Sequence, residues 1–221
     1  MRGSRVVPSV VGVSLLIGVA AFALPYDDPA PPEVLEAARV GLPRMLRAIP
    51  EQDLGFYGFA DAPELPRATL GEPFQLYTLD PQEIGDFAQG RIALLETHPT
   101  NRWLFPVVCD DRPRTLLAVA YLGGAWQAIE IGGLSPAPEM RELARQWPAA
   151  QGYRLRYIQV FAGGAQLVQV ANEELADLVP LESTARALGL IAPDETYDYP
   201  LMTPDEIATA LEPIVRAARS E

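Results

Sequence analysis

The side chains best suited to nucleophilic or metal chemistry are scarce in this chain, which has one histidine, His98, and one cysteine, Cys109. His98 lies in a predicted loop and is interpreted as a solvent-facing side chain, with a lone base or a lone ligand as the alternative. A zinc site takes about four nitrogen or sulfur ligands, and the chain offers only these two soft ones. Cys109 is interpreted as a small buried apolar residue. Asp110 and Asp111 beside it would disfavour its thiolate, so neither residue predicts a reactive site.

Carboxylates, by contrast, are abundant, with 29 Asp and Glu residues. Glycoside hydrolysis needs only two carboxylates a few ångströms apart, so a carboxylate-dependent hydrolase is the one catalytic class that remains, although no particular pair stands out. The acidic segment 194–206 has enough oxygen ligands for calcium, supplied by Asp194, Glu195, Asp198, Asp205 and Glu206. Its spacing does not match a calcium-binding loop. We therefore interpret it as a solvated acidic loop.

Two absences narrow the chemistry further. All 17 basic residues are arginines, so Schiff-base chemistry and lysine general bases are excluded. No serine lies in a G-x-S-x-G turn. The pair Gly132–Gly133 lacks the lysine and the frame of a phosphate-binding loop and is interpreted as a strand-to-helix turn. We assign no catalytic, cofactor-binding or metal-binding residue and no cofactor from the sequence.

The N-terminal segment 1–23 has the layout of a signal peptide. Arg2 and Arg5 precede an uncharged apolar stretch, residues 6–23, that closes on the small residues Ala21 and Ala23. This stretch of about 18 residues is also at the short end of what spans a bilayer, so cleavage and retention as a membrane anchor both stay open. Either reading predicts an extracytoplasmic domain, periplasmic, secreted or membrane-anchored. A proline-rich spacer, 24–32, then leads into one domain, 33–221.

The charge of this domain restricts its partners. Without Arg2 and Arg5 the basic count falls from 17 to 15 against 29 acidic residues, which gives a formal charge of −14. Such a surface repels phosphate groups, so nucleic acid is not expected as a partner. The single cysteine excludes an intramolecular disulfide, so stability must come from packing.

Periodicity and capping residues predict the elements of the domain. Helices are expected over 33–49, 80–89, 136–150, 173–188 and from 203 onward. Strands are expected over 73–79, 102–110, 114–122, 125–131, 153–161 and 166–171. The segment 53–70 is predicted to be an irregular loop. The order indicates an α+β fold whose antiparallel sheet of about five to six strands consists of a meander and a hairpin.

Within the meander, the strand over 102–110 is predicted to be central, because apolar side chains occupy both of its faces. Trp103, Phe105 and Trp126 are all expected in the core. The favoured function is a non-enzymatic domain that binds a protein partner at or near a membrane, as an accessory subunit of a membrane complex. An exported carboxylate-dependent hydrolase and a small-molecule carrier are the alternatives.

Overall fold

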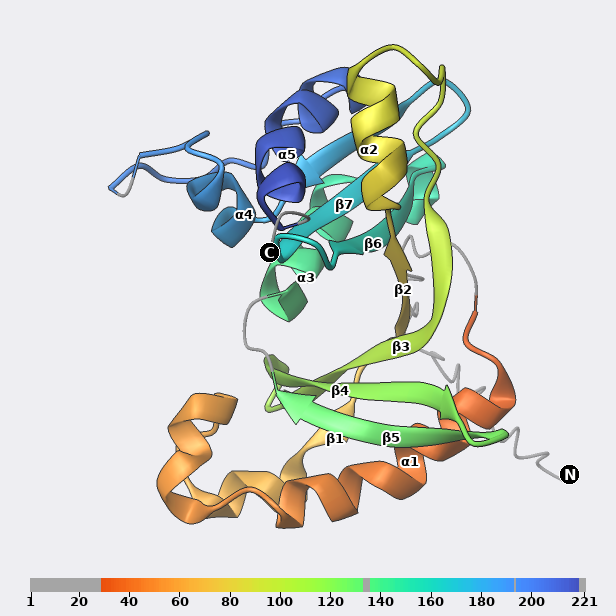
Figure 1. The fold of residues 1–221 in the computed structure, drawn as a ribbon. Helices are drawn as coiled ribbons and strands as arrows, with labels where there is room; N and C mark the ends of the chain where they lie inside the picture. Colours follow the sequence, from red (N-terminus) through yellow and green to blue (C-terminus); the bar gives the residue numbers. More distant parts are fainter. Residues whose placement is uncertain (1–28, 133–135, 193, 219–221) are drawn as a thin grey trace, which may run out of the picture.

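We describe a computed structural model of the chain over residues 29–132, 136–192 and 194–218. The leader, most of the spacer and Gly133 lie outside these ranges. Within these ranges, five α-helices and three short 3-10 helices accompany one sheet (Figure 1). The helices are α1 (Pro32–Arg47), α2 (Pro81–Ala88), α3 (Pro136–Gln146), α4 (Glu182–Ala187) and α5 (Pro204–Ala218), with η1 (Glu51–Tyr57), η2 (Ala62–Arg67) and η3 (Ala149–Gln151).

The sheet has eight strands and is mostly antiparallel. The strands are β1 (Thr69–Leu70), β2 (Phe74–Thr78), β3 (His98–Cys109), β4 (Arg112–Leu122), β5 (Ala125–Gly132), β6 (Arg154–Val160), β7 (Ala165–Ala171) and β8 (Ala176–Pro180). Their order is β5-β4-β3-β2-β6-β7-β8, with β1 also paired to β3. The α+β class and the meander are thus confirmed, as is the central position of β3. The expected count of five to six strands was too low, and the β2–β6 pair is parallel.

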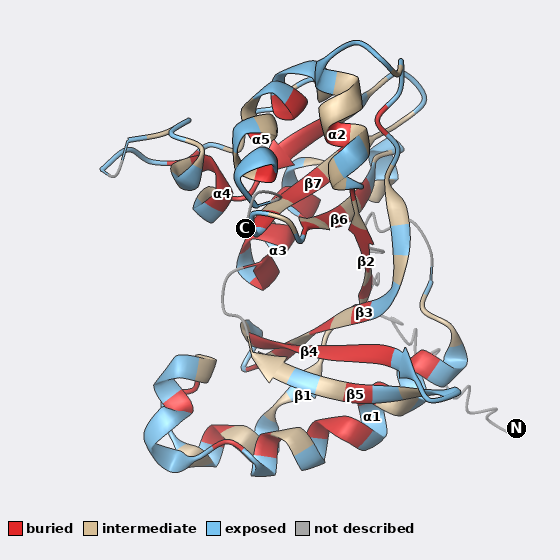
Figure 2. Cartoon of the chain, in the orientation of Figure 1, coloured by how far each residue is buried: buried red, intermediate tan, exposed pale blue. Residues whose placement is uncertain are grey.

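The molecule has two halves, and long β3 runs from one into the other (Figure 1). In one half, α1 packs against β3, β4 and β5 around Trp103, Phe105 and Leu117. In the other half, β6 and β7 are covered on both faces. Successive side chains of each strand point to opposite faces, as in any pleated sheet. Tyr157 points into the core with α3, and the next residue, Ile158, points into the core with α2 and α5. Buried residues accordingly run along these strands and along the inner sides of the helices (Figure 2).

The helix ends that depend on local signals form as predicted. Asp80 caps α2, its carboxylate accepting a hydrogen bond of 2.6 Å from the backbone N–H of Gln82. A reciprocal capping box opens α5: the backbone N–H of Glu206 donates to Thr203 Oγ1 at 3.3 Å, and the Glu206 carboxylate accepts from the backbone N–H of Thr203 at 2.8 Å. Hydrogen bonds between near neighbours in sequence suffice for both ends.

Two segments differ from their predictions. The expected loop over 53–70 contains much of η1, all of η2 and then β1, which is too short to leave an alternating pattern. The expected helix over 173–188 was wrong in its first part, where β8 pairs with β7 before α4 begins. Val179 and Leu178 are buried on opposite faces of β8, and this packing outweighs the helix preference of the preceding residues. Pro180 would also have disrupted a helix interior.

A close contact between α1 and β5 provides a test of how α1 packs on the sheet. A methyl group added at Gly41 would lie 2.1 Å from Cβ of Ala128, far inside van der Waals contact. We expect Gly41→Ala to lower the free energy of unfolding by about 1 to 3 kcal/mol, because helix and strand must separate. Chemical denaturation measures this cost.

Two further variants make the test specific. Gly55→Ala serves as the matched control, since a methyl group there meets nothing within 4 Å. In the background of Ala128→Gly, the added cost of Gly41→Ala should fall below about 1 kcal/mol, because the clashing methyl is gone. An equal cost in both backgrounds would contradict the contact.

Candidate functional site

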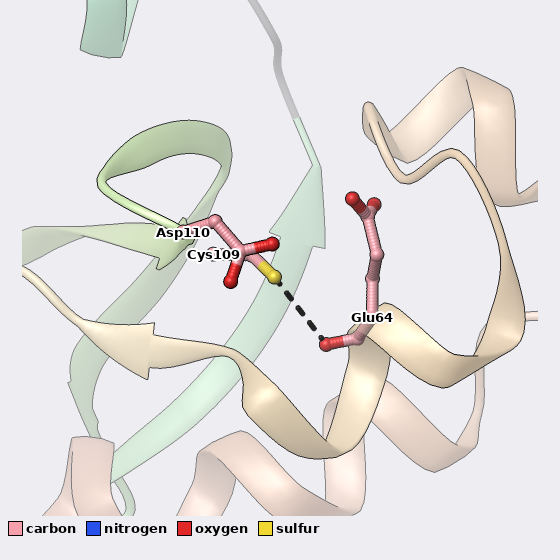
Figure 3. A group of neighbouring side chains, drawn as sticks. All are labelled: Glu64, Cys109 and Asp110. Atoms are coloured by element: carbon pink, nitrogen blue, oxygen red, sulfur yellow. Dashed lines mark hydrogen bonds between the residues drawn. The ribbon is translucent and has the colours of Figure 1, made fainter.

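Metal-ligating side chains come together at one place in the part of the chain that the structure describes. The carboxylates of Glu64 and Asp110 and the thiol of Cys109 all lie within 4.8 Å of one another. Cys109 ends β3, Asp110 begins the turn to β4, and Glu64 belongs to η2 (Figure 3). Sequence reasoning missed Glu64, because it is 45 residues away from Cys109 and only the tertiary fold brings them together.

The hydrogen bonds of this cluster argue against a metal site. The Glu64 carboxylate pairs with Arg114 and accepts a bond of 2.7 Å from the backbone N–H of Ala60. Both oxygens of Asp110 accept from Arg67 at 2.9 Å. Two guanidinium groups thus already neutralise the carboxylates, and a divalent cation would have to displace them. We interpret the cluster as structural.

Cys109 itself is buried and free, as predicted. Its thiol points at the backbone oxygen of Glu64, 3.7 Å away (Figure 3). Burial, and then the charge of Asp110, raise the pKa of the Cys109 thiol, so the thiolate that nucleophilic or metal chemistry requires is disfavoured. Asp110 and Asp111 form a two-residue turn with positive φ angles of 50° and 60°. The turn had been expected one residue later, over 111–113.

His98 is the first residue of β3, paired with Thr78, and not part of a loop as predicted. Its Nε2 lies 2.9 Å from Oε2 of Glu83 on α2, and both side chains are partly exposed. The hydrogen bond to Glu83 is the main cause that raises the pKa of His98. An imidazole and a carboxylate in this arrangement form an acid–base pair, and Cys109, the one thiol of the chain, lies at the opposite end of the same strand.

The pairing predicts how His98 titrates. Glu83→Gln should lower the pKa of His98 toward its ordinary value near 6.5, because the amide no longer favours the imidazolium. NMR can follow this directly, since the chain has one histidine. The raised pKa means that the stability from the pair is fully present below about pH 6.5 and is lost as the pH rises through the raised value. For a pair this exposed we expect less than about 1 kcal/mol. Glu96→Gln is the control, and an equal effect there would contradict the direct pairing.

The acidic residues over 194–206 have separate roles. Glu206 caps α5, and the bond from the Thr203 backbone lowers its pKa. Glu195 accepts a bond of 3.3 Å from the backbone N–H of Ala192. Of the described residues, none in this segment joins a group with metal-binding geometry.

A second buried polar group lies beneath α4. The Glu139 carboxylate, buried on α3, accepts a bond of 2.8 Å from the backbone N–H of Glu182, at the start of α4. Burial, with the charge of Glu139 next, raises the pKa of Tyr199 to about 12 and raises the pKa values of Tyr157 and Tyr197 as well. Neutral phenols around a carboxylate that holds a helix end form a structural arrangement.

The surface feature that stands out is an open groove of about 970 Å³ between α1 and the β4–β5 hairpin. We call it the tip groove. It is lined by Pro32, Glu33, Glu36, Ala37 and Val40 of α1 and by Tyr121, Gly124, Ala125 and Trp126 of the hairpin. The hairpin turn and the start of α1 lie at the same end of the molecule (Figure 1). Gly123 and Gly124 make the turn at positive φ, as the sequence predicted.

Exposed apolar and aromatic side chains line the tip groove. Val40 is 67% exposed and Tyr121 46% exposed. Tyr121 and Trp126 are cross-strand partners whose rings pack edge to face, with centroids 5.4 Å apart. Trp126 had been predicted in the core with Trp103 and Phe105. Those two are buried, but Trp126 only packs against the rim of that core and is partly exposed.

The described residues therefore offer an aromatic surface more plainly than a catalytic centre. A catalytic site would bring a nucleophile or a pair of acids into a concave, water-excluding pocket. The one acid–base pair is partly exposed, and the thiol is buried beside two guanidinium groups. In the described part of the chain, no helix has the length and apolar composition to cross a membrane. No protein-family model, curated protein or solved structure shows significant similarity to this chain.

Proposed function

We propose that this protein is an exported or membrane-anchored, non-enzymatic domain that binds a protein partner through the tip groove, as an accessory subunit of a membrane complex. The observation that carries the proposal is the exposed aromatic pair of Tyr121 and Trp126 beside Val40. Tyrosine and tryptophan are enriched where binding energy concentrates in interfaces. Their two-torsion side chains lose little entropy on binding.

The location of the groove supports a role next to the N-terminal segment. Pro32 lines the groove and is the first residue of α1, so the groove adjoins the point where the spacer enters the domain. The leader pattern of residues 6–23 favours export or anchoring. If the leader stays in the membrane as an anchor, a partner bound in the groove would lie near the membrane surface.

Site-specific photocrosslinking in the native host tests the proposal. A benzophenone amino acid replaces Tyr121, and the control places it at Phe161, which is 53% exposed in the turn after β6. We expect a protein adduct from position 121 that position 161 does not form. The captured protein, once purified, should bind the Trp126→Ala variant at least about tenfold more weakly than the unchanged chain. Equal binding, or no specific adduct, would refute the proposal.

The fate of the leader is tested separately. Intact mass or N-terminal sequencing of protein from the native host, membrane and soluble fractions both, distinguishes a start at Met1 from a start at Leu24. A start at Leu24 with recovery in the soluble fraction would eliminate the anchored form and leave partner binding by a released domain.

A small-molecule carrier is the second candidate function, and one observation favours it. A mainly apolar cleft of about 400 Å³, within the range of ligand pockets, lies between α1 and η2. It is lined by Leu42, Pro43, Leu46, Arg47, Leu65, Pro66 and Ala68. Ala68→Trp should fill the cleft, so a carrier function would be lost in this variant, whereas partner binding through the tip groove would be retained.

A further inference from the structure

We infer that the tip groove takes a basic apolar segment of the partner protein, one that presents arginine or lysine beside aliphatic or aromatic side chains. This inference rests on the proposed function and adds the chemistry of the partner. It follows from the groove's two kinds of wall, an apolar floor and an acidic rim.

The floor is provided by Val40, Ala37 and the aromatic pair. Covering this surface removes apolar area from water, which contributes about 25 cal/mol per Å². Edge-to-face packing holds the Tyr121 and Trp126 rings against each other, so the floor is partly organised before a partner arrives. The floor therefore selects an apolar side chain and carries no charge preference.

The rim is acidic and lies on the first turns of α1. Glu33 and Glu36 both line the groove. Glu33 is exposed and makes no ion pair among the described residues, whereas Glu36 pairs with Arg39. That pair is three residues apart and exposed, so it contributes little and can be exchanged for a partner's cation. A cation beside the apolar side chain would satisfy Glu33 and complete the charge match.

The same charges disfavour two other occupants. In a symmetric dimer built on this groove, Glu33 and Glu36 of one copy would approach the acidic rim of the other. Anionic lipid headgroups would meet the same rim, on a domain that carries an excess of acidic over basic residues. A basic protein segment avoids both repulsions, and its encounter is steered by the field of the acidic domain.

The test uses two synthetic amphipathic peptides that are identical except that the arginines of one are glutamates in the other. Fluorescence anisotropy of the labelled peptides measures binding to the full-length chain in a zwitterionic detergent. We expect the arginine peptide to bind at least about tenfold more tightly than the glutamate peptide, and added salt should reduce the difference. Trp126→Ala should weaken the arginine peptide by about tenfold or more.

A matched pair of double variants isolates the rim. Glu33→Gln with Glu36→Gln should weaken the arginine peptide by about five- to tenfold. The control, Glu173→Gln with Glu174→Gln, makes the same change of charge at exposed residues between β7 and β8 and should weaken it less than about twofold. Equal effects of the two double variants would mean that only net charge matters, and would overturn the inference.

The remaining outcomes separate this inference from the proposed function. Equal binding of both peptides, lost in Trp126→Ala, would refute the basic partner and support partner binding at the groove. Binding that is indifferent to Trp126→Ala, or no binding by either peptide, also refutes the inference, and the photocrosslink at position 121 then decides the proposed function by itself. Binding of the unchanged chain to anionic vesicles more tightly than to the arginine peptide, lost in Trp126→Ala, would assign the groove to lipid instead.

Discussion

Trp103→Ala is expected to lower the free energy of unfolding by about 3 to 5 kcal/mol. Trp103 is 3% exposed and lies on central β3, in the cluster that packs α1 against the sheet. Removal of the indole leaves a cavity that neighbours on two sides cannot fill, because β2 and β4 hold the backbone of β3 in place. Urea denaturation followed by circular dichroism gives the change, and an unaltered dependence on denaturant would show that the denatured state is unaffected.

Trp126→Ala is the matched comparison, since it removes the same side chain from the rim of the same cluster. We expect a loss of less than about 2 kcal/mol, because the partly exposed indole gives up less buried area. Equal costs for the two variants would place Trp126 in the core and remove the floor of the tip groove. A cost below about 1 kcal/mol for Trp103→Ala would contradict the packing of α1 on the sheet.

Arg114→Met is expected to lower the free energy of unfolding by about 2 to 4 kcal/mol. Arg114 and Glu64 form a largely buried ion pair, with side chains 19% and 8% exposed. Removal of the guanidinium leaves the Glu64 carboxylate buried without its cation, and that penalty exceeds the value of the pair itself. The bond from Ala60 to Glu64 alone does not offset it.

Two variants decide whether the unpaired Glu64 carboxylate causes the loss of stability in Arg114→Met. Arg67→Met removes an arginine of the same cluster whose pair with Asp110 is exposed, and we expect a loss of less than about 1 kcal/mol. Glu64→Gln combined with Arg114→Met leaves neither charge of this pair and should recover at least half of the loss measured by urea denaturation for Arg114→Met. Without that recovery, the effect of Arg114→Met would be lost packing of its aliphatic stem.

Local signals were sufficient for much of this fold. The caps at Asp80 and at Thr203 depend on atoms at most three residues apart, and the Gly123–Gly124 turn depends on backbone freedom at two positions. Alternation along β3 correctly placed Trp103 and Cys109 on one buried face. Such features can be predicted from the sequence, because the interactions that decide them lie within a few neighbouring residues.

The proposed and rejected sites, by contrast, depended on the tertiary structure. Glu64 meets Cys109 only because η2 folds against the end of β3, and β8 is a strand only because β7 offers it an edge. The alternation of side chains along β5 assigns Trp126 to one face of the strand. It does not reveal how far α1 extends over that face. The sequence therefore determined most of the helices and strands, the charge and the few reactive residues. Which aromatic side chain stayed exposed was decided only when α1 packed on the sheet, since burial is a property of the assembled layers and not of any one segment.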